Sequence, residues 1–151
     1  MPSLIGSKVE RKEDKKFLTG KGRYTADINL VHQTYAYFLR SPHARAKIKN
    51  VDISKALKSS GVVKIFTGDD IAKEKIGGLI AGWKIVSQDG KDMKVPNHPP
   101  LAKDSVNYVG DHVAIVIAET LEEEKNAAEL INVSYDVQKD VVSTNDAMQS
   151  D

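Results

Sequence analysis

The chain has 151 residues, of which 40% are apolar and 28% charged, a composition that suits one globular domain with its own core. A net charge of +1 gives no overall attraction to nucleic acid, and no apolar run is long enough to cross a bilayer. The sequence contains no cysteine, which excludes disulfides, thiolate nucleophiles and thiolate-bound metal centres and fits a reducing cytoplasm.

The chain begins with a polar and basic stretch. We expect residues 1–12 to form an extended arm and residues 13–148 to form the folded domain. Residues 13–18 favour one short helical turn, which Thr19-Gly20 ends. The end of the chain is acidic, and we interpret both charged regions as solvated surface rather than as a nucleic-acid site.

Two strands are expected next along the chain. Residues 34–40 are dense in aromatic side chains, and Ser41-Pro42 then breaks the strand because proline has no amide hydrogen to donate. Residues 46–53 alternate between apolar and polar side chains, with one irregularity near Asn50. Both segments therefore favour strands with one face on a core.

A short helix and a third strand follow. Ser54 is a predicted N-cap for a helix over residues 55–60, which Gly61 ends. Residues 62–66 are predicted to form the strand. The sequence Thr-Gly-Asp-Asp at 67–70 has the spacing of a capping box that opens one helical turn.

The middle of the chain, residues 73–101, is the least regular part. Its glycines and prolines are turn formers, and they separate short apolar runs. We predict a hairpin here, with one strand over residues 79–86, a turn at 88–90 and a return strand over 93–95.

The last third has the clearest pattern. Residues 113–118, Val-Ala-Ile-Val-Ile-Ala, are uninterrupted apolar, so both faces of this strand should be covered. Residues 133–137 form the next expected strand. The connection over 119–132 is long enough for a right-handed crossover if the two strands are parallel. The fold class is therefore α+β, with a mixed sheet, short helices and a buried central strand near 113–118.

The connection itself is predicted to be helical. Thr120 and Glu123 fit a capping box at the start of a helix over residues 121–131. The helical period places Leu121 and Ile131 on the side that should face the core.

A search for chemistry finds no self-sufficient catalytic, cofactor or metal site. The four histidines lack the spacing of metal ligands, and no serine lies in a nucleophile elbow. The carboxylate pairs at 69–70 and 122–124 lie where helices begin, which favours a capping role over acid–base catalysis. The histidines are His32, His43, His98 and His112.

Several segments, taken in order, resemble one family over about residues 5–148. Together they look like the start of the molybdopterin-binding large subunit in the xanthine dehydrogenase, aldehyde oxidase and aerobic carbon monoxide dehydrogenase family. The resemblance implies an α/β hammerhead domain. The segments are residues 11–14, 17–24, 39–44, 61–70, 100–102, 108–110, 113–119 and 127–135.

The resemblance also implies a function for the chain. In the family this domain precedes a longer catalytic portion that holds molybdopterin, and the iron–sulfur clusters and FAD lie in other domains or subunits. The chain alone would then bind no cofactor and act as a structural and assembly domain of a cytoplasmic molybdenum hydroxylase. Arg40, His43 and Tyr108 are the candidate contacts with those partners.

One alternative stays open from the sequence. The chain would then be a stand-alone, non-catalytic interaction module or a remnant derived from such a domain. The Asp111-His112 pair departs from the family pattern, so the sequence does not indicate a substrate.

Overall fold

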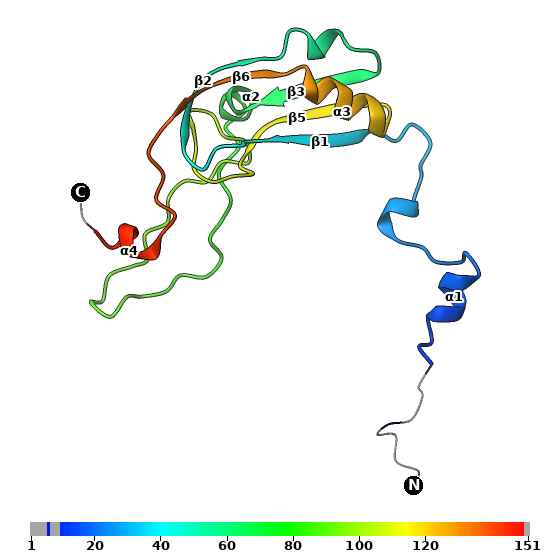
Figure 1. The fold of residues 1–151 in the computed structure, drawn as a ribbon, viewed down its shortest axis with the longest axis horizontal. Coiled ribbons are helices and arrows are strands. Elements are labelled where there is room, and N and C mark those ends of the chain that lie inside the picture. Colours follow the sequence, from blue (N-terminus) through cyan, green and yellow to red (C-terminus); the bar gives the residue numbers. More distant parts are fainter. Residues whose placement is uncertain (1–5, 7–9, 150–151) are drawn as a thin grey trace. The chain divides into compact units, whose positions relative to one another are not determined.

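The structure is a computed structural model that describes residue 6 and residues 10–149 (Figure 1). The chain divides into two units, Met1–Gln33 and Thr34–Asp151. In the first unit the short helix predicted at 13–18 is present as α1 (Asp14–Leu18). The predicted arm lies mostly outside the described residues, so its boundary stays a prediction.

The first unit contains one small ring contact. The side chain of Phe17 stacks on Tyr24 with 5.6 Å between ring centroids, and a Cβ on Gly22 would meet the Phe17 ring at 2.9 Å. A larger residue at that position would therefore require the Phe17 ring to shift. A 3-10 turn, η1 (Thr25–Asp27), follows, and the carboxylate of Asp27 accepts a hydrogen bond from the Tyr24 amide at 2.8 Å.

The second unit contains two three-stranded sheets. The first sheet has the order β1-β5-β3, formed by β1 (Tyr35–Arg40), β5 (His112–Ala118) and β3 (Val62–Thr67). Both pairings are antiparallel, so the predicted apolar strand at 113–118 is the central strand of its sheet.

The second sheet has the order β4-β2-β6 and is also antiparallel. It consists of β4 (Ser105–Val106), β2 (Ala46–Asp52) and β6 (Asn132–Val137). The register of β2 against β6 shifts between Ile48 and Asn50, which is the irregularity that the sequence pattern indicated.

The α+β class is confirmed, whereas the crossover considered for the case that the strands at 113–118 and 133–137 are parallel does not occur. Strands β5 and β6 lie in different sheets, and α3 (Leu121–Glu129) carries the chain from one to the other. The 3-10 helix η2 (Ala56–Lys58) makes a similar connection between β2 and β3. Two antiparallel sheets therefore replace the single mixed sheet that was expected, and Figure 1 shows the second lying over the first.

The helix predicted over 55–60 is shorter than expected. Ser54 does not cap it, because the Ser54 amide donates to the carboxylate of Asp52 at 2.9 Å and the 3-10 turn begins after Lys55. The predicted stop at Gly61 is confirmed: its φ is +71°, and a Cβ there would collide with the carboxylate of Glu123.

The predicted hairpin forms only at its turn. Ser87 donates its amide to Lys91 O at 2.9 Å, and Val86 and Asp92 make an isolated bridge. No strand is present among residues 73–104 of the described chain. A two-stranded ribbon without a sheet to pack on is marginally stable in water, and this segment has no such neighbour.

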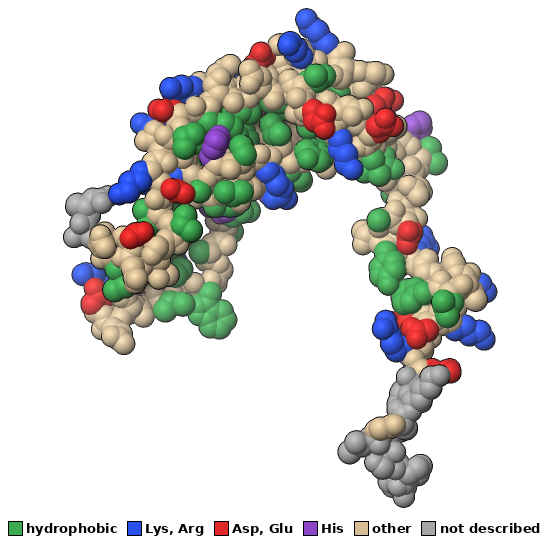
Figure 2. Space-filling model, in the orientation of Figure 1, with side chains coloured by type: hydrophobic (Ala, Val, Ile, Leu, Met, Phe, Trp, Pro, Cys, Tyr) green, Lys and Arg blue, Asp and Glu red, His purple; other side chains and the backbone are tan. Residues whose placement is uncertain are grey.

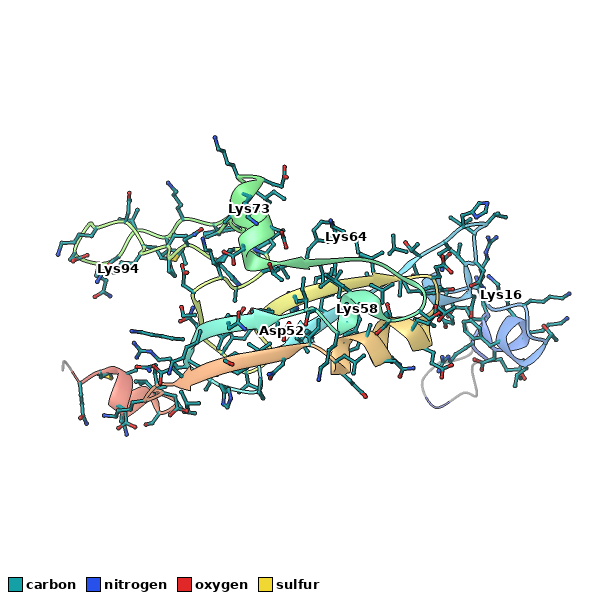
Figure 3. The ribbon with its side chains drawn as sticks, turned by 90° about the horizontal axis from the view of Figure 1, so that it is seen from above. Lys16, Asp52, Lys58, Lys64, Lys73 and Lys94 are labelled. Atoms are coloured by element: carbon teal, nitrogen blue, oxygen red, sulfur yellow. The ribbon has the colours of Figure 1, made fainter. Side chains whose placement is uncertain are left out.

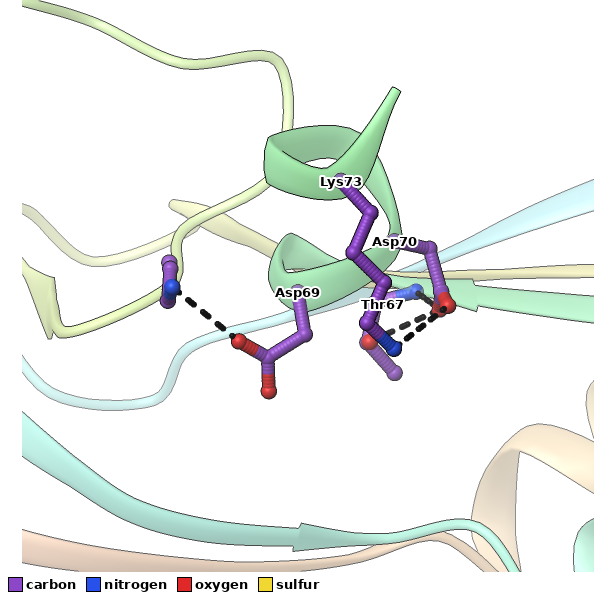
Figure 4. Close-up of polar contacts among 5 residues, drawn as sticks. Thr67, Asp69, Asp70 and Lys73 are labelled. Carbon is purple, nitrogen blue, oxygen red and sulfur yellow. Dashed lines mark hydrogen bonds and ion pairs between the residues drawn. The ribbon is translucent and has the colours of Figure 1, made fainter. Parts of the chain in front are cut away.

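The capping box predicted at 67–70 is present at the start of α2 (Gly68–Lys73). The carboxylate of Asp70 accepts hydrogen bonds from the Thr67 amide at 2.8 Å and from its hydroxyl at 2.9 Å (Figure 4). These bonds, led by the one from the amide, hold the pKa of Asp70 below its ordinary value. A Cβ on Gly68 would collide with the backbone of Ala102, so only glycine lets α2 lie this close to that segment.

The N-cap of α3 is also as predicted, but the helix buries a different face from the one expected. The Glu123 amide donates to the Thr120 hydroxyl at 3.2 Å. Leu121 is 55% exposed instead of buried, and Glu124 faces inward with 4% of its surface exposed. One carboxylate oxygen of Glu124 has no hydrogen-bond partner in the described structure.

The core consists of two clusters that share side chains. One packs α3 and η2 on the first sheet through small residues, including Ala114, Ala127 and Ala128. The other lies beside the second sheet. Val51 and Val133 pack against both clusters, so the two sheets and their connecting helices share one apolar interior.

We expect replacement of Glu124 to stabilise the domain. Burial raises the pKa of the Glu124 carboxyl above its ordinary value of 4.5, so the folded state holds this proton more tightly than the unfolded state. The wild type should lose stability as the pH rises above 4.5. At neutral pH Glu124→Met should raise the free energy of unfolding by about 1–3 kcal/mol, measured by urea denaturation.

The exposed Glu122 in the same helix turn provides the control. Glu122→Gln should change the free energy of unfolding by less than about 0.5 kcal/mol. Equal effects of the two substitutions, or a gain that does not grow with pH, would contradict the assignment of Glu124 as an unpaired buried acid.

Candidate functional site

Two turns that are far apart in the sequence clamp each other at one end of the first sheet. The amide of Ser41 donates to Asp111 O and the amide of Gly110 donates to Ser41 O, both at 2.8 Å. Gly110 has a φ of +94°, a left-handed conformation that favours glycine. We call residues 40–43 and 108–111 together the turn clamp. It fixes the end of β1 to the start of β5.

The side chain of Ser41 stabilises its own turn and leaves no free nucleophile. Ser41 is 2% exposed, and its hydroxyl accepts from the His43 amide and donates to His43 O, each at 3.0 Å. Such hydroxyl–backbone bonds are typical of serine in turns. The preceding strand ends here because Pro42 cannot donate to a ladder.

Asp111 organises the other turn. It is 5% exposed, its carboxylate accepts from the Asn107 amide at 3.1 Å, and its own amide donates to Tyr108 O at 3.2 Å. Burial, and after it the charge of Asp111, raises the pKa of the Tyr108 hydroxyl. Tyr108 therefore keeps its proton at neutral pH.

The structure places all three predicted interface residues in the turn clamp. Arg40 donates from Nη1 to Gly110 O at 3.2 Å, so it reaches across the clamp to the turn that carries Tyr108. Tyr108 is 44% exposed, and its hydroxyl lies 3.2 Å from Nε2 of His98. His43 belongs to the other turn of the clamp, and its ring contacts Tyr135 of the second sheet edge-on at 4.9 Å. The part of these residues in an interface stays a prediction.

A hollow of about 420 Å³ lies beside the turn clamp. Tyr108, Asp111 and His98 line it together with the loop at residues 96–99. Its three ionisable side chains bind one another or the backbone: His98 contacts Tyr108, and Asp111 accepts from the Asn107 amide. The hollow therefore holds a hydrogen-bonded support for the clamp rather than a free acid–base pair.

The described residues offer no cluster of side chains that could ligate a metal ion directly. Over residues 10–149, no three histidines, aspartates or glutamates converge in a way that could hold a metal ion. The full sequence has no cysteine to supply thiolate ligands. We derive no chemical step at this site. Of the helices in the described part of the chain, none is both long and apolar enough to span a membrane.

Sequence reasoning missed Ser41 and Asp111, the two buried polar residues of the clamp. Serine before proline and aspartate after glycine are common in turns, and that was the available signal. The sequence gives no indication that the two turns, about 70 residues apart, meet in space. The antiparallel pairing of β1 with β5 is what brings them together.

The two packed antiparallel sheets, their helical connections and the turn clamp define an α/β hammerhead domain. The profile of the aldehyde oxidase and xanthine dehydrogenase a/b hammerhead domain matches residues 19–139. The chain belongs to this family.

Known proteins support the assignment along the chain. The nicotine 6-hydroxylase large subunit of Paenarthrobacter nicotinovorans is 37% identical over 134 residues, which cover 89% of this chain and 16% of that protein. The carbon monoxide dehydrogenase large chain of Afipia carboxidovorans is 32% identical over 97% of this chain and 17% of its own length. The crystal structure of quinoline 2-oxidoreductase from Pseudomonas putida 86 matches with a TM-score of 0.81 and 33% identity, over 95% of this chain and 18% of that one. The chain thus spans about a sixth of the length of these relatives.

The turn clamp should be a measurable source of stability. Asp111→Ala removes the buried acceptor of the Asn107 amide, so we expect a loss of about 1–3 kcal/mol in the free energy of unfolding. Asp104→Ala, at an exposed carboxylate nearby in the sequence, should cost less than about 0.5 kcal/mol. Urea denaturation of both variants tests this, and equal losses would show that Asp111 has no special role.

Proposed function

We propose that this chain is the structural and assembly domain of a molybdenum hydroxylase large subunit, of the carbon monoxide dehydrogenase or aldehyde and xanthine oxidoreductase type. The molybdopterin site belongs to a catalytic portion beyond this domain, and iron–sulfur clusters and FAD belong to further domains or subunits. The assembled enzyme is cytoplasmic in this proposal. The support is the family membership together with the apolar surface of the chain.

The observation that carries the proposal is an exposed apolar segment between α2 and the turn clamp. We call residues 76–95 the apolar segment. Ile80 is 92% exposed and Trp83 is 81% exposed, and Figure 2 shows hydrophobic side chains gathered on this part of the molecule, at the lower left. The other exposed large apolar residues of the segment are Ile76, Leu79, Ile85, Val86, Met93 and Val95.

Such a segment favours a domain that packs on a partner. Proteins that act as monomers rarely expose a large contiguous apolar patch, because removing apolar surface from water lowers the free energy. A module that works as a monomer would leave these side chains in water. The apolar segment therefore supports the assembly domain over the stand-alone alternative.

Purification from the organism that encodes the chain tests the proposal. With an affinity tag on its N-terminus, the chain should be recovered in a one-to-one ratio with a molybdopterin-binding portion, either as a continuation of the same polypeptide or as a separate chain. Molybdenum, measured by mass spectrometry of the metal, should accompany that portion and be absent from the isolated domain of residues 1–151.

Two results would overturn the proposal. One is recovery of the domain as a monomer with no molybdopterin-binding partner. The other is turnover of an aldehyde, a purine or carbon monoxide by the purified domain alone.

A further inference from the structure

One face of the first sheet is apolar and only partly covered. We call it the outer face, because it is the side of β1-β5-β3 that lies away from the core formed with α3. Phe38 of β1 and Phe66 of β3 both lie opposite Ile115 of β5 in the antiparallel register. Ala36 and Lys64 both lie opposite Ile117. Residues directly opposite one another share a face, so these side chains form one surface.

The two faces of the sheet differ in burial along the central strand, although Tyr37 of the edge strand β1, opposite Val116 on the inner face, is 36% exposed. On the inner face, Ala114, Val116 and Ala118 of β5 are all 0% exposed. On the outer face, Ile115 and Ile117 are half-buried, Phe38 is 38% exposed and Phe66 is 37% exposed. This part of the chain thus leaves two aromatic rings of its central sheet in contact with water.

The sequence of the sheet is that of a structure covered on both sides. An antiparallel sheet with one face in water alternates apolar and polar residues, whereas a sheet buried on both faces has continuous apolar runs. Strand β5 is continuous apolar from Val113 to Ala118, and its outward positions are isoleucines where polar residues would serve in water. The outer face therefore requires a cover.

A hollow extends the outer face towards α2. Its volume is about 380 Å³, and Phe66, Ile115, Ile71 and Ile76 supply its apolar lining. Ile76 is also the first residue of the apolar segment. The outer face and the apolar segment are therefore continuous at this point and suit a single occupant.

Basic groups lie on the same surface. Lys64 extends over the ring of Phe66, with its Nζ 5.8 Å from the ring centroid. Figure 3 shows Lys64 beside β3 and Lys73 on α2. Arg40, a predicted interface residue, lies opposite His112, whose ring packs 4.7 Å from that of Phe38. Arg40, which belongs to the turn clamp, thus stands at the end of the outer face.

We propose that the outer face is the docking surface for the molybdopterin-binding portion of the large subunit, and this rests on the function proposed above. The relatives carry more than four fifths of their length outside the region matched here, so a large body of polypeptide is available to cover the face. Permanent interfaces are apolar and resemble a domain core cut in half, which describes this surface. The covering surface is apolar at its centre and carries an acidic group near Lys64 and Arg40.

A second copy of this chain is a poorer occupant. If two copies packed through this face, Arg40 and Lys64 of one copy would face Arg40 and Lys64 of the other. The carboxylate of Asp70, which borders the hollow, is already bound to Thr67 and lies 4.0 Å from Lys73. Glu74 is the other acid at the hollow, so the cations Lys64, Lys73 and Arg40 outnumber the carboxylates that a second copy could offer them. Charge complementarity therefore favours a more acidic partner over a second copy.

Site-specific photo-crosslinking in the purified complex tests the assignment. The photoreactive residue p-benzoylphenylalanine replaces Phe66 in one preparation and Leu57 in a matched control. Leu57 is 48% exposed but lies on η2, which packs with the inner core of the sheet. The Phe66 probe should crosslink to the molybdopterin-binding portion, and mass spectrometry should locate the crosslink at an apolar surface. The Leu57 probe should give no such product.

A polar substitution gives a second measurement. With the two portions produced as separate chains, Phe66→Gln should weaken their association about tenfold or more, and Leu57→Gln should leave it within about twofold. The thermal midpoint of each isolated variant shows that the domain is still folded. A loss that appears only together with unfolding would overturn the assignment.

The outcomes separate this inference from the function on which it rests. If the wild-type chain brings down no molybdopterin-binding portion, the proposed function fails and the docking surface fails with it. If the complex forms but the Phe66 probe crosslinks to a second copy, to an iron–sulfur or flavin subunit, or to nothing, only the docking surface is overturned. Equal crosslinking from Phe66 and Leu57 also overturns it.

Discussion

The close contact of small side chains between α3 and the first sheet is the constraint on which the domain depends. Ala127 of α3 and Ala114 of β5 are both 0% exposed and belong to one cluster. Small residues let the helix approach the sheet closely, and larger ones at these positions would force the core apart. Because α3 also links β5 to β6, its distance from the first sheet sets where the second sheet lies.

The turn clamp applies a similar rule to polar groups. Buried polar atoms must be hydrogen-bonded, and Ser41 and Asp111 meet that requirement with backbone groups of their own turns and of each other's. Glu124 is the exception, since one of its carboxylate oxygens is buried without a partner. The outer face breaks the corresponding rule for apolar groups, because it leaves apolar side chains in contact with water. The buried carboxylate of Glu124 lowers the stability of the domain, whereas the exposed outer face favours binding of a partner.

Local features could be predicted from the sequence, whereas pairing in space could not. The strands at 34–40, 46–53 and 62–66, the cap at 67–70 and the central strand at 113–118 all have strong local patterns, and all are present. The sequence could not decide whether β5 and β6 share a sheet, because an apolar strand, a helix and another strand give the same pattern whether the chain returns to its own sheet or enters another. The hairpin at 79–95 failed because alternation cannot indicate that a sheet is missing to receive it. Leu121 is exposed rather than buried because the helical phase was inferred from polarity alone, and Glu124 is buried in the same helix.

The same limit applies to the candidate site. Arg40, His43 and Tyr108 were selected by resemblance, and the structure places all three in the turn clamp. Their proximity follows from the register of β1 against β5, which only tertiary structure shows. The buried residues that hold the clamp together have ordinary turn compositions, so the sequence did not distinguish them from surface loops.

The order of the strands has a consequence for how the chain is held together. Strands β1, β2 and β3 precede the apolar segment and β4, β5 and β6 follow it, yet each sheet has a central strand from one side of that segment and both edges from the other. Neither half of the chain can build a sheet by itself. A protease cut within residues 76–95 would therefore leave two fragments that stay together as a nicked domain, and separately produced halves would become ordered only on meeting one another.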